Sequence, residues 1–122
     1  MMGVYDGTMS IGELSARTGA SVRALRYYEQ HRLLDARRTS AGHRRFSEDA
    51  VETVRRVRLF LEAGLPLAVV SQIMPCFIDD GERLDACVSE YLRDHLGGVQ
   101  ARIDELDKQQ MTVARLQRLV VA

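Results

Sequence analysis

Apolar and polar residues alternate with a helical period near the start of the chain. Ser10 is followed three positions later by Glu13, the spacing of a capping box, in which both side chains satisfy backbone amides where a helix begins. We therefore expect a short helix that runs to about Thr18, where Gly19 ends it.

A second helix is predicted directly after this turn, because Ser21 is a typical N-cap residue. Three apolar residues then recur at every third position: Val22, Leu25 and Tyr28. This spacing favours Tyr28 as the ring that packs inward and Tyr27 as the ring that faces outward. Two short capped helices joined by a tight turn form a helix-turn-helix pattern.

A small β-hairpin and two further helices are predicted next. Residues 37–46 have small and polar residues in the middle and arginines at both ends, which indicates a hairpin with a basic rim. Ser47, which two acidic residues follow, starts a third helix that should end at Gly64. Pro66 suits the first turn of a fourth helix, over residues 67–74, which the next proline ends. The turn-rich stretch after it, residues 76–85, is predicted to be a loop or a loop with one helical turn.

The last part of the chain has a different period, typical of a coiled-coil seam. Apolar residues are spaced alternately four and three apart, with glutamines at two expected positions: Leu92, Leu96, Val99, Ile103, Leu106, Val113 and Val120. One helix over residues 88–120 would be about 50 Å long and could not cover this stripe by itself, which predicts a homodimer. Gly97 and Gly98 each weaken a helix by about 1 kcal/mol, which predicts a kink or a close helix approach there.

Length and composition narrow the class of protein. The chain has 122 residues, 46% of them hydrophobic and 28% charged, which is ordinary for one compact globular domain. No apolar run is long enough to span a membrane, and Met1 to Thr8 lack the order of a signal peptide. We therefore expect a cytoplasmic protein without a membrane partner.

The net charge of zero conceals an uneven distribution. Residues 1–60 contain 11 arginines and 7 acidic residues, a net charge of +4, whereas residues 61–122 contain 6 basic and 10 acidic residues, a net charge of −4. Arginine suits phosphates and guanine edges, so the first half is typical of a nucleic-acid reader and the second of a protein–protein element. An uneven but merely solvated surface would give the same charges.

Exposed polar residues of the second helix and the hairpin are the candidate DNA contacts. A helix that enters the major groove needs donors on its outer face near its N-terminus, and basic residues of a hairpin can follow the phosphates beside the groove. The candidate residues are Ser21, Arg23, Arg26, Tyr27, Arg38, His43, Arg44 and Arg45.

These elements together predict a mostly α fold in three parts. Residues 9–75 would form a winged helix-turn-helix DNA-binding domain, residues 76–87 a connecting loop or hinge, and residues 88–122 a long coiled-coil dimerisation helix.

Three motifs resemble the MerR (mercury-resistance regulator) family of transcription regulators. They are the Arg-x-Leu-Arg-Tyr-Tyr-Glu recognition helix at residues 23–29, the Leu-Leu pair at 33–34, and the wing of the form Arg-x-x-x-Gly-x-Arg-x-aromatic at 38–46. Residues 58–67 are similar to the family's third helix and second wing, so motifs cover roughly residues 9–74. The resemblance implies a dimer, paired through antiparallel helices, that binds a near-palindromic promoter site. It would bend and untwist the DNA so that RNA polymerase can read an over-long spacer.

Some positions depart from the family pattern. Arg32 stands where the family often has glycine, and Ala36 stands where proline is usual, which puts the geometry of that turn in doubt. His43 and Phe46 replace frequent tyrosines, so hydroxyl contacts from those positions would be lost and the operator sequence could differ.

Cys76 and Cys87 are the candidate sensor residues, and three interpretations stay open. They are ordinary half-buried thiols, a reversible disulfide or electrophile-sensing pair, or a metal site completed by a partner subunit. In metal-sensing members of the resembled family, a cysteine near the start of the dimerisation helix joins cysteines in a loop after that helix. Cys87 resembles the first of these by position, but no cysteine follows it here. No cofactor is established from the sequence, and two thiolates alone underfill a tetrahedral metal shell.

No catalytic pattern accompanies these features, so an enzyme is not expected. The sequence predicts a dimeric, sequence-specific transcriptional regulator that binds and distorts promoter DNA, with a thiol-reactive, redox or metal signal as a further hypothesis. The alternatives are a helical protein–protein interaction module and an architectural protein that only bends DNA.

Overall fold

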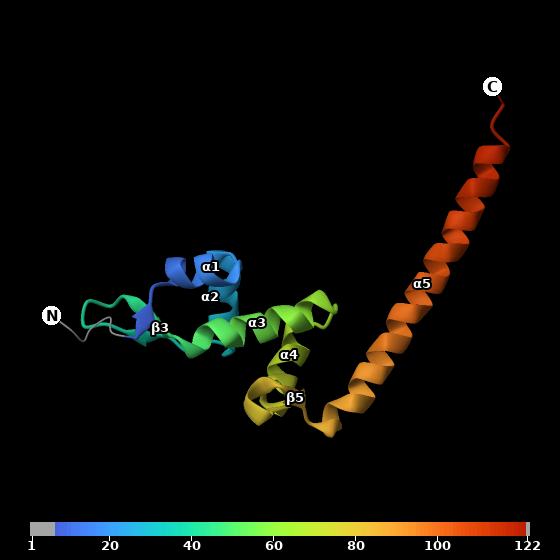
Figure 1. Cartoon of the computed structure of the whole chain (residues 1–122). Coiled ribbons are helices and arrows are strands. Elements are labelled where there is room, and N and C mark those ends of the chain that lie inside the picture. Colours follow the sequence, from blue (N-terminus) through green and yellow to red (C-terminus); the bar gives the residue numbers. More distant parts are fainter. Residues whose placement is uncertain (1–6, 122) are drawn as a thin grey trace. The chain divides into compact units, whose positions relative to one another are not determined.

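The computed structural model describes residues 7–121, so residues 1–6, on which the signal-peptide expectation largely falls, and Ala122, the last residue of the predicted dimerisation helix, lie outside it. The described chain divides into two compact units, the first ending at Pro75 and the second beginning at Cys76 (Figure 1). The protein is mostly helical, with a winged helix-turn-helix in the first unit and a long helix in the second. No helix among the described residues is long and apolar enough to span a membrane.

The helix-turn-helix consists of α1 (Ile11–Thr18) and α2 (Val22–Gln30), in agreement with the prediction. Both halves of the predicted capping box form at Ser10 and Glu13, and Ser21 caps α2 by accepting a hydrogen bond from the Ala24 amide. Gly19 between the helices has a φ of 79°, and a Cβ there would lie 2.9 Å from Nη1 of Arg58. Only glycine therefore fits this turn without a shift of its neighbours.

A three-stranded antiparallel sheet flanks the helices in the order β1–β3–β2. Strand β2 (Arg37–Arg38) pairs with β3 (Arg44–Ser47) and forms the predicted hairpin. Strand β1 (Thr8–Met9), which no sequence pattern predicted, pairs with the other edge of β3.

Two further helices, α3 (Asp49–Glu62) and α4 (Leu67–Ile73), complete the first unit. The prediction that Ser47 starts α3 was wrong. Ser47 instead pairs with Thr8 as the last residue of β3, and Glu48 stands at the N-cap without a side-chain hydrogen bond. Helix α3 ends before Gly64 as predicted, and α4 ends at Ile73, from which a 3-10 turn over Met74–Cys76 carries the chain through Pro75.

The core of the first unit lies between the helices and the sheet. Helix α1 packs against α2, α3 and β3, and α3 packs against α4. Six side chains are fully buried in this core: Leu14, Leu25, Phe46, Val54, Val57 and Val70. They come from every large element of the unit, so these elements share one core.

The second unit begins with a small hairpin, where a loop or a loop with one helical turn was predicted. Strand β4 (Phe77–Ile78) pairs antiparallel with β5 (Arg83–Leu84), and a 3-10 turn over Asp79–Gly81 joins them. Each strand has two residues, which is too short for a recognisable alternation of apolar and polar positions.

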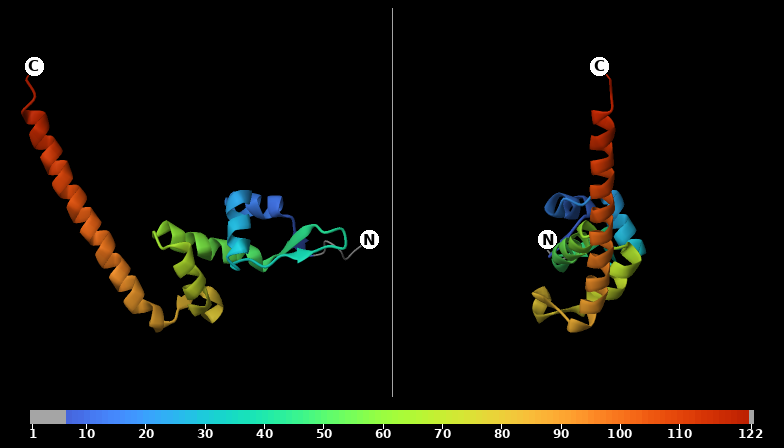
Figure 2. Two further views of the ribbon diagram at one scale, coloured as in Figure 1. Left: turned by 180° about the vertical axis from the view of Figure 1, so that it is seen from behind. Right: turned by 90° about the vertical axis from the view of Figure 1, so that its right-hand side faces the viewer.

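Helix α5 (Ser89–Arg118) follows and runs for 30 residues, about 45 Å. It continues without interruption through Gly97 and Gly98, so the predicted kink is not present (Figure 2). A Cβ at either glycine would meet no atom within 4 Å. Large apolar side chains of this segment are exposed: Leu96, Ile103, Leu106, Met111, Val113, Leu116, Leu119, Val120 and Val121.

Candidate nucleic-acid interface

The outer face of α2 carries the first group of predicted contact residues. Arg23, Arg26 and Tyr27 are exposed, whereas Leu25 and Tyr28 are buried, as the helical spacing predicted. These exposed side chains border a shallow hollow along α2 that also includes Ser21 and Gln30. The Ser21 hydroxyl accepts a hydrogen bond from the Ala24 amide, and this bond holds the side chain at the N-terminus of α2.

The two neighbouring tyrosines of α2 have different surroundings. Tyr28 is 5% exposed, and its burial raises the pKa of its phenol. Tyr27 is 52% exposed, and its ring contacts that of His31 edge-on at a centroid distance of 4.5 Å. The hydroxyl of Tyr27 is thereby available on the outer face of α2, while Tyr28 serves the core.

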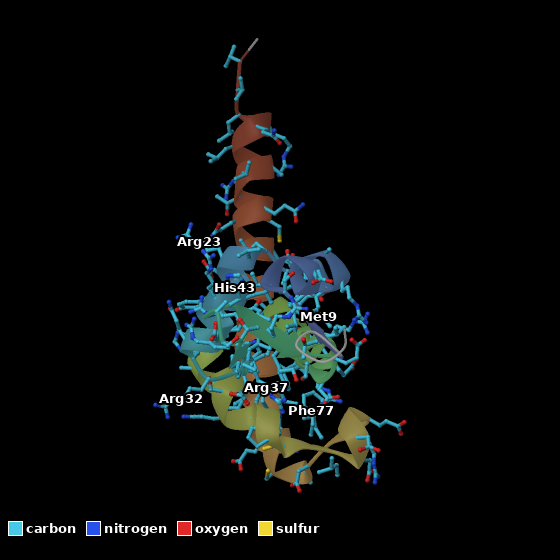
Figure 3. All side chains as sticks on the ribbon, turned by 90° about the vertical axis from the view of Figure 1, so that its left-hand side faces the viewer. Met9, Arg23, Arg32, Arg37, His43 and Phe77 are labelled. Carbon is cyan, nitrogen blue, oxygen red and sulfur yellow. The ribbon has the colours of Figure 1, made fainter. Side chains whose placement is uncertain are left out.

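The hairpin between β2 and β3 carries the second group. Its turn is closed by the Thr39 amide, which donates to the His43 carbonyl at 2.8 Å, and by Nη1 of Arg38, which donates to the Gly42 carbonyl at 3.0 Å. His43 is exposed directly after this turn. In the view of Figure 3, His43 and Arg23 lie on one side of the first unit, and Met9 lies on the other.

An ion pair joins the hairpin to α2. Nε of Arg44 lies 3.0 Å from Oε1 of Glu29, and the Arg44 side chain remains 38% exposed. A hollow at this junction is lined by Arg26 from α2 together with hairpin residues: Arg38, Gly42, His43, Arg44 and Arg45. Five of the predicted contact residues therefore come together around one depression.

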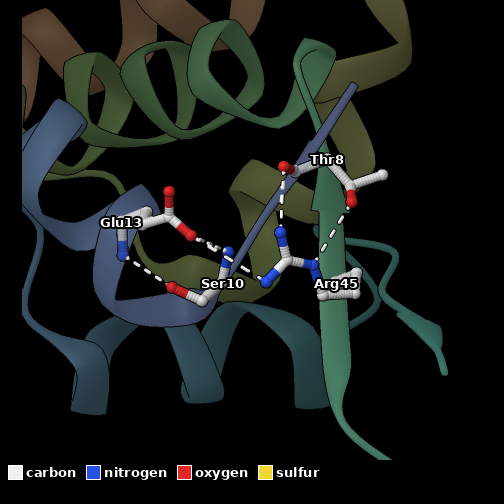
Figure 4. A network of polar contacts seen from close by, with 4 residues as sticks. All are labelled: Thr8, Ser10, Glu13 and Arg45. Carbon is white, nitrogen blue, oxygen red and sulfur yellow. Dashed lines mark hydrogen bonds and ion pairs between the residues drawn. The ribbon is translucent and has the colours of Figure 1, made fainter. Parts of the chain in front are cut away.

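Arg45 has a different environment from the other candidates. Its Nε donates to Oγ1 of Thr8 at 3.2 Å, and one Nη donates to the Thr8 carbonyl at 3.1 Å (Figure 4). Its other Nη lies 3.9 Å from the Glu13 carboxylate, and the Arg45 side chain is only 14% exposed. Hydrogen bonds from Ser10, and secondarily the charge of Arg45, lower the pKa of Glu13. The guanidinium thus links β3, β1 and the start of α1.

Sequence reasoning missed two members of this arrangement. Glu29 lies in the recognition-helix motif, but nothing local indicated that it pairs with an arginine fifteen positions later. Thr8 could not be identified because its strand has only two residues, too few to give a periodic pattern of apolar and polar positions. Both contacts depend on residues that only the folded unit brings together.

The candidate sensor residues lie in the second unit. Sγ of Cys76 and Sγ of Cys87 are 3.8 Å apart, and both cysteines are free thiols. Among residues 7–121, no group of three or more His, Cys, Asp or Glu side chains is placed to hold a metal ion.

Comparisons with known proteins agree with this architecture. The model of the MerR HTH family regulatory proteins matches residues 9–75. The nodulation protein NolA of Bradyrhizobium sp. (strain NC92) is 33% identical over 94 residues, which are 76% of this chain and 36% of that protein. This chain therefore spans about a third of the length of NolA.

Solved structures extend the match to the second unit. The transcription regulator PbrR691 from Ralstonia metallidurans CH34, solved with lead(II), has a TM-score of 0.75 and 22% identity, with 93% of this chain and 88% of that chain covered. HiNmlR, a MerR family regulator solved bound to promoter DNA, has a TM-score of 0.57 and 22% identity over 84% of this chain and 78% of that chain. Because the family model spans more than half of the sequence, this chain belongs to the MerR family of helix-turn-helix regulatory proteins.

Proposed function

We propose that this regulator binds double-stranded promoter DNA through the surface formed by α2 and the β2–β3 hairpin. The observation that carries the proposal is the hollow lined by Arg26, Arg38, Arg44 and the polar side chain of His43, because it joins arginines of two elements at one place. Affinity for the DNA polyanion would come from these charges. The DNA-bound structure of a family member with the same fold supports the proposal.

The two elements would have different roles on the duplex. Arg23 and Arg26 near the start of α2 would reach base edges in the major groove, where arginine can donate two hydrogen bonds to guanine. Arg38 and His43 would contact phosphates beside the groove, and the hydroxyl of Tyr27 would donate a hydrogen bond to a phosphate oxygen. Arg44 would keep its ion pair with Glu29 and also contact a phosphate, because its side chain remains partly exposed.

A homodimer would present two such surfaces to a near-palindromic site. The exposed apolar residues along α5 support this arrangement, because a second α5 could cover them. The dimer would bend and untwist the promoter so that RNA polymerase can use it, and the protein would act on transcription rather than as an enzyme. No covalent chemistry is required for this role.

The test is a titration of the full chain against a labelled duplex from its own gene's upstream region, at several salt concentrations, with fluorescence anisotropy as the readout. We expect saturable binding that weakens steeply with salt. Replacement of Arg23 with alanine should cost about 1–3 kcal/mol on the specific site and relax the preference for one base pair.

Two further variants sharpen this test. Arg38→Ala should weaken binding to every duplex alike and lower the salt dependence by about one counterion, as expected for a phosphate contact. Arg115→Ala removes the same charge from an exposed position on α5 and should leave affinity nearly unchanged. Absence of binding in low salt, or unchanged affinity in both hairpin and α2 variants, would favour the interaction-module alternative.

A further inference from the structure

The two cysteines of the chain flank the β4–β5 hairpin. We call Cys76 and residues 85–87, where the chain enters and leaves this hairpin, the hairpin neck. Ten residues separate Cys76 from Cys87, yet their Sγ atoms lie 3.8 Å apart. A disulfide needs about 2.05 Å between the sulfurs, so the two Sγ atoms would have to move about 1.8 Å closer together for the bond to form.

Backbone pairing holds this neck in place. The strand register pairs Phe77 with Leu84, and the next position is fixed by the Asp85 amide, which donates to the Cys76 carbonyl at 2.7 Å. The Asp85 carboxylate then accepts a hydrogen bond from the Cys87 amide at 2.9 Å. Asp85 therefore positions one cysteine through its amide and the other through its side chain.

Both thiols are open to small reagents. Cys87 is exposed and Cys76 is half-buried, so neither sulfur is sealed in a core. Among the described residues no group of three or more His, Cys, Asp or Glu side chains is placed to hold a metal ion, whereas two neighbouring thiols are enough for a disulfide.

We propose that Cys76 and Cys87 form a reversible dithiol–disulfide site that low-molecular-weight disulfides oxidise. In the first step, the thiolate of one cysteine attacks a sulfur of oxidised glutathione, forms a mixed disulfide and releases one glutathione thiolate. The second cysteine, as its thiolate, attacks the protein sulfur of that mixed disulfide and releases the second glutathione. The protein loses two electrons and two protons, and one oxidised glutathione becomes two reduced molecules.

The disulfide would close a covalent ring over residues 76–87 and prevent the hairpin neck from opening. The proposal does not rest on DNA binding, since both sulfurs and the groups that position them belong to the second unit. Its failure would therefore leave the proposed function intact.

The rate of ring closure should reflect the surroundings of Cys87. The Asp85 carboxylate, and then the neighbouring Cys76 thiol, raise the pKa of Cys87 to about 11, which keeps it protonated at neutral pH. Because only the thiolate attacks, oxidation should be slow at pH 7 and faster at higher pH. Asp85→Asn keeps an oxygen for the Cys87 amide but removes the charge, so it should speed the reaction at pH 8.

The experiment equilibrates the full-length protein with mixtures of reduced and oxidised glutathione, blocks remaining thiols with iodoacetamide and measures the intact mass. We expect a chain two hydrogens lighter, with no alkylated cysteine and no attached glutathione, at a yield independent of protein concentration. It should form at oxidised glutathione concentrations at least about tenfold below those that give mixed disulfides in Cys76→Ser or Cys87→Ser, because the second thiol is intramolecular.

A matched variant separates geometry from the mere presence of two thiols. Cys87→Ser combined with Ser89→Cys keeps two cysteines in the chain but removes the thiol from the residue that Asp85 positions. We expect this variant to form mixed disulfides instead of an intrachain bond. The proposal is overturned if the native chain accumulates mixed or intermolecular disulfides, if its thiols stay free where the serine variants react, or if the matched variant closes equally well.

Discussion

Arg32 occupies a backbone conformation that favours glycine. Helix α2 ends in a Schellman motif, in which the Leu33 amide donates to the Tyr28 carbonyl at 2.9 Å and the Arg32 amide donates to the Glu29 carbonyl at 3.0 Å. This motif requires a left-handed residue, and Arg32 has a φ of 60°. The departure from the family pattern at this position therefore leaves the turn geometry intact and is tolerated at a cost in conformational energy.

Replacement of Arg32 with glycine should raise the free energy of unfolding. Relief of the left-handed strain outweighs the extra freedom of glycine in the unfolded chain, and we expect a gain of about 0.5–1 kcal/mol. Urea denaturation measures it as a higher midpoint with an unchanged slope. Arg32→Ala is the control, because it removes the same charge but keeps the Cβ, and it should give no gain.

The reactivity of Cys87 also depends on individual neighbouring residues. Its pKa of about 11 lies above the ordinary thiol value, so the thiolate fraction at pH 8 is low and grows as the pH approaches 11. In Cys76→Ser, where Cys87 is the only thiol, alkylation by iodoacetamide should still increase up to at least pH 10. A rate that levels off near pH 8.5 would contradict the role given to the Asp85 carboxylate.

At the scale of elements, Arg45 connects three segments that the sequence separates. It bridges β3 to Thr8 of β1, 37 positions earlier, and its charge lies near Glu13 at the start of α1. We infer that Arg45 positions the wing against the helix-turn-helix, whereas the sequence alone suggested a phosphate contact. That contact stays a prediction, but it would compete with the hydrogen bonds to Thr8.

Loss of this link should destabilise the first unit. Arg45→Ala leaves the Thr8 groups without their partner in a part-buried place, and we expect a loss of about 1–3 kcal/mol in the free energy of unfolding. Arg37→Ala, at the position of β2 that pairs with Arg45 but fully on the exposed edge, should change it by less than about 0.5 kcal/mol. Equal effects in urea denaturation would show that Arg45 has no positioning role.

At the scale of the whole molecule, α5 presents an apolar stripe that one chain cannot cover. Ile103 is 45% exposed and Leu106 is 61% exposed, although their spacing is that of a coiled-coil seam. A Cβ at Gly97 or Gly98 would meet no neighbouring atom. Of the two alternatives predicted for these glycines, the close approach of a partner helix stays a prediction.

A charge in this stripe should therefore weaken self-association. We expect Leu106→Asp to raise the dimer dissociation constant by at least about tenfold, because the aspartate would be buried between two helices. Lys108→Glu reverses a charge on the opposite face of α5 and should leave association almost unchanged. Analytical ultracentrifugation measures both, and a wild-type chain that stays monomeric at micromolar concentration would exclude the dimer.

Local sequence patterns account for the features that arise within a few turns of chain. The caps at Ser10 and Ser21, the left-handed turn at Gly19 and the inward position of Tyr28 all depend on neighbours three or four residues away, so local spacing predicted them. The length of α5 followed in the same way from its repeating period.

Contacts between side chains that are distant in the sequence depend on the folded structure. The pairing of Arg44 with Glu29, the hydrogen bonds of Arg45 to Thr8 and the approach of Cys76 to Cys87 join residues that lie 11 to 37 positions apart. Each contact depends on strand register and helix packing, which place polar groups together because apolar side chains elsewhere in the same unit are buried. The sequence thus named most of the polar residues of the interface, and the fold decided which of them face outward and which hold the unit together.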